Sequence, residues 1–148
     1  MYKRQLNDIP KESSMLGKAN IISEGKDITI VSYSNMVNIS KEAIAAEELQ
    51  NYSIELIDLQ TVSPIDYDTI KNSLKKTKRL LVCQEAPSNS SVGTTVISKI
   101  VESDLFHELE VAPKLVSGLH SPMPSAKHLE LNVIPQAEDI TNAIKSML

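Results

Sequence analysis

The sequence of 148 residues has no tryptophan, and aromatic residues make up 3% of it. Flat stacking surfaces for nucleic-acid bases or sugar rings are therefore scarce. The single cysteine, Cys83, excludes an internal disulfide and a thiolate metal cluster, which fits a reducing compartment. Basic tracts are also missing and the net charge is −4, so the sequence does not favour a surface that follows nucleic-acid phosphates.

Long apolar runs and a leader are missing as well. No apolar stretch approaches the ~20 residues needed to cross a bilayer, and the first residues, MYKRQLNDIPKESS, lack the apolar centre of a signal peptide. These absences predict a cytoplasmic protein. Residues 1–27 are polar and broken by Pro10, Gly17 and Gly25, which predicts a linker or arm from a preceding, missing domain. Residues 28–148 predict one compact domain.

What the sequence does contain is a regular alternation of strand and helix patterns. Apolar, β-branched runs predict buried strands at residues 27–33, 53–59, 79–85 and 114–119. Apolar residues at helical spacing predict helices over about 35–51, from Pro64 past Leu74, over 92–105 and over 136–148. Strands that alternate with helices predict a three-layer α/β/α sandwich with a mostly parallel central sheet.

The stretch IDLQTVSPID, residues 57–66, marks one junction between strand and helix. Ser63 is a favourable N-cap, Pro64 suits the first helical position, and Asp66 follows Ser63 by three residues as in a capping box. We therefore expect the helix to begin at Ser63 and Pro64.

Polar side chains gather where the predicted parallel strands end, and ligands of such sheets usually bind outside these carboxyl ends. This carboxyl-end rim consists of Ser32, Ser34, Thr61, Ser63, Glu85 and the 87–91 loop. Glu85 is the best candidate for a functional carboxylate because it ends a strand at this rim. The stretch SNSSVG, residues 88–93, is read either as a solvated turn or as an anion cradle.

Known chemical motifs do not accompany this rim. The sequence contains neither GxGxxG after the first strand nor a P-loop, and its three histidines have no metal-ligand spacing. Cys83 lies within an apolar strand, where a thiol is usually a core side chain. The residues alone therefore predict a fold without a catalytic, cofactor-binding or metal-binding constellation.

Longer stretches carry a family resemblance. The segments LGKANI with EGKDITIV, IDLQTVSPID and KKTKRLLVCQEAP, followed by VGTTVISKI and IPQAEDITNAIKSML, span nearly the whole chain. In this order they resemble the transketolase C-terminal domain. They are most similar to the C-terminal domain of one beta subunit. That subunit belongs to the thiamine-diphosphate-dependent dehydrogenase component of 2-oxo acid dehydrogenase complexes. These complexes act on branched-chain 2-oxo acids (2-oxoisovalerate) or on pyruvate. Two loops, SNSSVG and SPMPSAKHLE, depart from the family pattern.

The resemblance implies an oxidoreductase fragment whose own domain is inactive. Thiamine diphosphate and Mg would be bound by other domains of the intact enzyme. The implied partners are an alpha subunit and a second beta subunit in a heterotetramer, and the basic peripheral subunit-binding domain of the lipoyl acyltransferase. Glu110 and the carboxylate of Leu148 are the candidates for docking that domain.

Two alternatives remain at this point. Besides the beta-subunit domain, the sequence fits the C-terminal domain of another thiamine enzyme, such as transketolase or deoxyxylulose-phosphate synthase, or an independent α/β module that binds a small anion at the rim.

Overall fold

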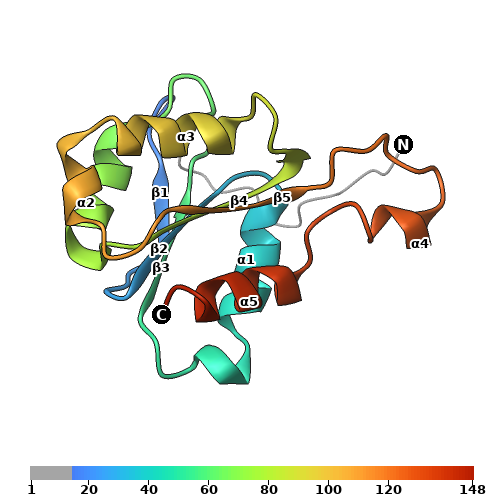
Figure 1. Cartoon of the computed structure of the whole chain (residues 1–148), viewed down its shortest axis with the longest axis horizontal. Helices are drawn as coiled ribbons and strands as arrows, with labels where there is room; N and C mark the ends of the chain where they lie inside the picture. The colour runs from blue at the N-terminus through green and yellow to red at the C-terminus, as the bar shows by residue number, and fades with distance from the viewer. Residues whose placement is uncertain (1–14) are drawn as a thin grey trace.

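The computed structural model describes residues 15–148. Figure 1 shows a central sheet with helices packed on both of its faces. The elements are β1 (Asn20–Ser23), β2 (Ile28–Ser32), α1 (Met36–Ile44), η1 (Glu47–Leu49), β3 (Ile54–Asp58), α2 (Tyr67–Thr77), β4 (Leu80–Pro87), α3 (Val92–Val101), η2 (Asp104–Glu108), β5 (Lys114–Gly118), α4 (Lys127–Glu130) and α5 (Ala137–Lys145).

The sheet has five strands within the described residues, in the order β1-β3-β2-β4-β5. β3, β2, β4 and β5 are parallel, whereas β1 pairs with β3 in the antiparallel sense. The chain passes from β2 outward to β3 and then back across β2 to β4. The topological switch point therefore lies between β2 and β4, where the sheet is expected to leave a crevice at its carboxyl edge.

Two apolar clusters fill the space on the two faces of the sheet. Alternate residues of β2 divide between them, because Ile28 and Ile30 face the layer of α1 and α5 whereas Val31 faces the layer of α2 and α3. In β4, Leu81 and Cys83 belong to the first cluster, and the neighbouring residues on the opposite face belong to the second. The three-layer α/β/α sandwich expected from the sequence is confirmed.

The predicted strands and main helices are present with shorter bounds. β2, β3 and β5 begin and end within the predicted runs, and β4 extends two residues further to Pro87. The first helix ends at Ile44 instead of near residue 51, and the remaining stretch forms the short 3-10 helix η1. α4 was not predicted and is a single turn on a projecting segment between β5 and α5 (Figure 1).

β1 lies inside residues 1–27, the stretch predicted to be a linker or arm. Asn20 pairs with Asp58 and Ile21 with Ile57, so this short segment forms the edge of the sheet beside β3. The sequence pattern missed it because an edge strand of four residues, half of them exposed, lacks a sustained apolar alternation. The remainder of the predicted arm, residues 1–14, lies outside the described residues.

The start of α2 differs from the prediction that this helix begins at Ser63 and Pro64. The N-cap is Asp66, not Ser63, and the helix begins at Tyr67. The side chain of Asp66 accepts a hydrogen bond from the Thr69 backbone N–H at 3.2 Å, whereas Ser63 is exposed and follows Val62 in a loop that contains a cis Ser63-Pro64 peptide bond. A buried carboxylate makes stronger, charge-assisted hydrogen bonds than a serine hydroxyl, so Asp66 takes the capping role.

Candidate functional site

The carboxyl edge of the sheet carries the residues predicted for the rim, but it does not bring them together. Ser32 is fully buried and its hydroxyl donates to the Cys83 carbonyl at 3.2 Å, which ties β2 to β4. Glu85 is half-buried near the end of β4. Thr61 and Ser63 follow β3 and lie on the far side of β2 from β4. The predicted rim is therefore divided between two places.

Gln84 occupies the switch point and was not singled out from the sequence. Its side chain is fully buried, and its amide nitrogen donates to the carbonyls of Ala86 at 2.9 Å and Pro87 at 3.1 Å. Its oxygen accepts the Gly93 backbone N–H at 2.7 Å and the Tyr33 hydroxyl at 3.5 Å. A buried amide with all these partners fixes the end of β4 and the start of α3 against each other.

The 88–93 stretch is bound internally in the same way. Ser91 caps α3, with Thr94 completing a reciprocal capping box. A Cβ atom at Gly93 would lie 2.6 Å from Gln84 Oε1 and 2.6 Å from Leu115 Cδ1, so a larger residue would have to displace these side chains. Since the Gly93 N–H is already used by Gln84, the arrangement supports a structural loop over an anion cradle.

Tyr33 and Glu85 interact electrostatically across the switch point. Burial raises the pKa of Tyr33, and the charge of Glu85 raises it further. The phenol is therefore protonated and able to donate at neutral pH. Cys83, beside them in β4, is fully buried, and burial raises the pKa of its thiol to about 12. The thiol is thus unsuited to nucleophilic chemistry.

Thr61 and Asp66 instead bind the chain that leads into β1. The Gly17 backbone N–H donates to Thr61 Oγ1 at 3.1 Å, and the Ala19 backbone N–H donates to Asp66 Oδ2 at 3.1 Å. These two hydrogen bonds were not predicted, because the bonded residues are 44 and 47 positions apart in the sequence. Part of the expected ligand rim is thus occupied by the protein itself.

The predicted docking residues lie away from the carboxyl-end rim. Glu110 forms an ion pair at 2.6 Å with Arg79, the residue just before the amino end of β4. The Glu110 side chain is 49% exposed. Leu148 is half-buried against the apolar cluster on the α1 and α5 face, and Val111, next to Glu110, packs against the same cluster. The carboxylate of Glu110 is therefore engaged on one side and open to solvent on the other.

Glu55 is a buried carboxylate that no motif in the sequence marks. Its side chain is 0% exposed, and Oε2 accepts from Lys76 Nζ at 2.6 Å and from the Gly25 N–H at 3.1 Å. Burial acts to raise the pKa of Glu55, but the hydrogen bonds from Lys76, Ser73 and Gly25 outweigh it, so the pKa lies below its ordinary value. The only signal in the sequence is one acid between the apolar residues of β3.

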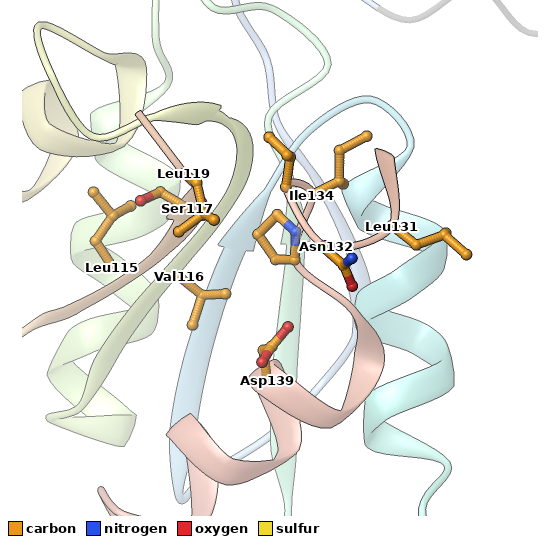
Figure 2. A pocket seen from close by; sticks show the side chains of 10 residues that line it. Leu115, Val116, Ser117, Leu119, Leu131, Asn132, Ile134 and Asp139 are labelled. Carbon is orange, nitrogen blue, oxygen red and sulfur yellow. The ribbon is translucent and has the colours of Figure 1, made fainter. Parts of the chain in front are cut away.

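A hollow of about 480 Å³ lies between β5 and the segment that leads into α5 (Figure 2). Leu115 and Leu119 contribute to one wall and Leu131 and Ile134 to the other. Asp139 is its only charged lining residue, and one of its carboxylate oxygens accepts the Gln136 backbone N–H at 2.8 Å. Most of the lining side chains are apolar, but the exposed surface of the hollow is more polar than apolar, so the hollow by itself identifies neither a ligand nor a partner.

The side chains that could hold the metal of a thiamine diphosphate site are not grouped together in the described part of the chain. Residues 15–148 contain no cluster of three histidine, cysteine, aspartate or glutamate side chains able to hold a metal ion. The Gly93 backbone N–H at the start of α3 donates to Gln84. In the same part of the chain, none of the helices has the length and apolar character to cross a bilayer.

Comparison with known proteins identifies the relatives of this fold. The family model for the transketolase C-terminal domain matches residues 17–140. The pyruvate dehydrogenase E1 component subunit beta of Rickettsia bellii is 38% identical over 131 residues, which is 88% of this chain and 40% of that protein. The corresponding subunit of Staphylococcus epidermidis is 36% identical over 151 residues, covering 100% of this chain and 46% of that protein.

A solved structure has the same fold. A split-gene transketolase, described as an inactive beta4 tetramer, matches with a TM-score of 0.79 at 21% identity, over 97% of this chain and 46% of that one. The chain thus spans less than half the length of each of these relatives. The family resemblance expected from the sequence is confirmed.

Proposed function

The chain belongs to the transketolase C-terminal domain family, and from this we propose that it serves as the assembly and docking domain of a 2-oxo acid dehydrogenase beta subunit. One observation carries the proposal. Beta subunits of pyruvate dehydrogenase E1 match almost all of this chain while the chain matches less than half of each of them. The other part of such a subunit would supply what this domain lacks.

For the whole enzyme we propose the oxidative decarboxylation of pyruvate, with acyl transfer to a lipoyl acyltransferase. Pyruvate is preferred because the two bacterial beta subunits are named for it. Branched-chain 2-oxo acids, expected from the sequence, remain the alternative substrates. Thiamine diphosphate and Mg would be held by other domains, a proposal supported by the lack of a cluster of metal-ligating side chains among residues 15–148. A cytoplasmic location remains part of the proposal.

The proposed partners are an alpha subunit and a second beta subunit, which would form a heterotetramer, and the peripheral subunit-binding domain of the acyltransferase. The exposed side chains of Leu119 and Leu131, which line the hollow beside β5, are suited to subunit packing. Glu110 and the Leu148 carboxylate are suited to a basic partner, because one side of Glu110 is open to solvent. Exposed charges of this kind mainly set the association rate and the orientation of a complex.

Another thiamine enzyme, such as transketolase, is supported at the level of fold alone, because the solved relative is 21% identical. An independent anion-binding module is supported less, because the 88–93 loop uses its best-placed amide internally. We therefore retain the dehydrogenase beta subunit as the proposed parent.

Calorimetric titration with the peripheral subunit-binding domain of a lipoyl acyltransferase tests the docking role. We expect binding that weakens several-fold in Glu110→Gln, and again when the Leu148 carboxylate is amidated, with a steep dependence on salt. Glu108→Gln, an exposed acid close by, is the matched control. No heat of binding at low salt would refute the docking role, and pyruvate decarboxylation by the chain alone would refute the assembly role.

A further inference from the structure

The junction between β3 and α2 binds the chain segment that precedes β1. Three consecutive residues, 17–19, lie against it: the Gly17 N–H donates to Thr61 at 3.1 Å, the Ala19 N–H to Asp66 at 3.1 Å, and the Lys18 ammonium lies 3.8 Å from Asp66. Two backbone donors and one charge from a continuous segment thus contact residues 61–66. We call this arrangement the clasp.

Asp66 is the central residue of the clasp. Its side chain is 3% exposed, and it accepts from the Thr69 N–H at 3.2 Å and the Thr69 hydroxyl at 2.8 Å in addition to the Ala19 N–H. One carboxylate therefore caps α2 and holds the segment before β1. Because both carboxylate oxygens are needed as acceptors, an amide of the same shape can serve only one of the two backbone donors.

Thr61 and Gly17 form the second half of the clasp. Thr61 accepts from Gly17 and donates its own hydroxyl hydrogen to the Pro64 carbonyl at 3.1 Å. Gly17 has φ +75°, and a Cβ atom there would lie 2.9 Å from Pro64 Cγ. Glycine is thus required both by the backbone conformation and by the close approach to Pro64.

We propose that the clasp is an intramolecular docking site that fixes the direction in which the polypeptide reaches this domain. β1 alone does not fix that direction, because its four residues end the sheet and nothing in the strand pairing restrains the chain before Asn20. The clasp adds restraints three residues earlier, at Gly17. If the chain is part of a longer beta subunit, as proposed above, the same restraint would set the orientation of the domain that precedes this one. This step rests on the proposed function.

Exposed apolar side chains beside the clasp support this role. Leu16 is 79% exposed, Met15 is 72% exposed and Val62 is 45% exposed. Leu16 and Val62 are each adjacent in sequence to one partner of the Gly17 to Thr61 hydrogen bond. A domain attached before Met1 would be tethered to these side chains through residues 1–14, so its effective concentration there would be in about the millimolar range.

Electron-paramagnetic distance measurements on the chain itself test the clasp. Nitroxide labels are placed on Met15→Cys and on Glu138→Cys, an exposed position at the start of α5. Native Cys83 does not interfere, because its thiol is buried with a pKa of about 12. We expect one narrow distance distribution, which broadens at least twofold in Asp66→Asn, and amide hydrogen exchange at Ala19 that accelerates by about tenfold, as for a lost hydrogen bond.

Asp68→Asn, an exposed acid in the first turn of the same helix, is the control and should leave both readouts unchanged. If Asp66→Asn does not fold, Thr61→Val decides, because it removes the Gly17 contact but leaves the cap of α2. A distribution that is already broad in the parent protein overturns the proposal. So does a folded Asp66→Asn or Thr61→Val protein with an unchanged distribution. Neither result depends on any subunit partner, so the proposed function is tested separately.

Discussion

Replacement of Lys76 by methionine should lower the free energy of unfolding, because it leaves the buried Glu55 carboxylate in β3 without its cation. Among the described residues, Lys76 is the only cation that forms an ion pair with Glu55, with 2.6 Å between Lys76 Nζ and Glu55 Oε2. The Glu55 side chain is 0% exposed. Methionine keeps most of the apolar stem of the lysine but removes the charge. Glu55 then retains the Gly25 N–H at 3.1 Å as its backbone donor.

The expected loss follows from the burial of the two partners. Removal of one member of a fully buried ion pair costs about 3 to 5 kcal/mol. The Lys76 side chain is 44% exposed, so water replaces part of the lost interaction and we expect about 2 kcal/mol at pH 7. Urea denaturation at constant m-value measures this difference.

The stabilities of the native protein and the Lys76→Met variant should change in opposite directions with pH. In the native protein the pKa of Glu55 lies below its ordinary 4.5, so its stabilisation is present above that pH and is lost as the pH falls. Without Lys76, burial dominates and raises the folded pKa, so the variant loses stability as the pH rises. The difference between the two proteins should therefore shrink from pH 7 to pH 4.

Two further variants decide whether the reasoning is correct. Lys75→Met, at the adjacent exposed position, should change stability by less than about 0.5 kcal/mol. Combining Glu55→Leu with Lys76→Met should recover much of the loss, because no charge then remains buried. A loss in Lys76→Met that is below about 0.5 kcal/mol, or that is equal at pH 4 and pH 7, would refute the argument.

Three other predictions concern the clasp, the α3 start and the thiol. The pKa of Asp66 is held below its ordinary 3.8 by hydrogen bonds that outweigh burial, so its stabilisation is present above that pH and lost as the pH falls. Urea titrations of Asp66→Asn between pH 5 and pH 2 should show a shallower decline than the parent, and parallel curves would contradict this. Gly93→Ala should lose about 1 to 3 kcal/mol, because the new Cβ atom lies 2.6 Å from both Gln84 Oε1 and Leu115 Cδ1; an unchanged thermal midpoint would show that these neighbours relax. Cys83 should resist a disulfide reagent at pH 8 until the protein is unfolded in urea, because its thiol is buried with a pKa of about 12. Rapid reaction in the native state would show that β4 opens.

The sequence predicted the centre of the sheet well for a simple reason. β2 and β4 are covered on both faces, so runs such as ITIVS are apolar or hydroxyl-bearing without interruption. β1 was missed because only one side of it meets another strand, and its exposed residues can be polar. Both Ser63 and Asp66 are typical caps, and the local pattern does not reveal that Asp66 is buried and accepts the Thr69 N–H whereas Ser63 is exposed.

The candidate site was predicted less completely than the fold. Glu85 was expected to end its strand, but it lies inside β4, which continues to Pro87, because the apolar pattern stops before the strand does. Gln84 was missed because its role depends on the distance to Gly93 across a loop. Thr61 was predicted for a ligand rim and instead binds Gly17, which no local pattern reveals. Whether Glu110 and Leu148 dock a partner stays a prediction.

The antiparallel edge strand has a practical consequence for anyone who trims this protein. Cutting at residue 28, where the regular pattern begins, would remove β1 and leave the outward backbone groups of β3 without partners. An uncovered strand of this kind, with Ile54, Leu56 and Ile57 in its sequence, is a template for self-association. A shortened version that keeps residues from Gly17 onward should remain dispersed, whereas one that starts at Ile28 should precipitate.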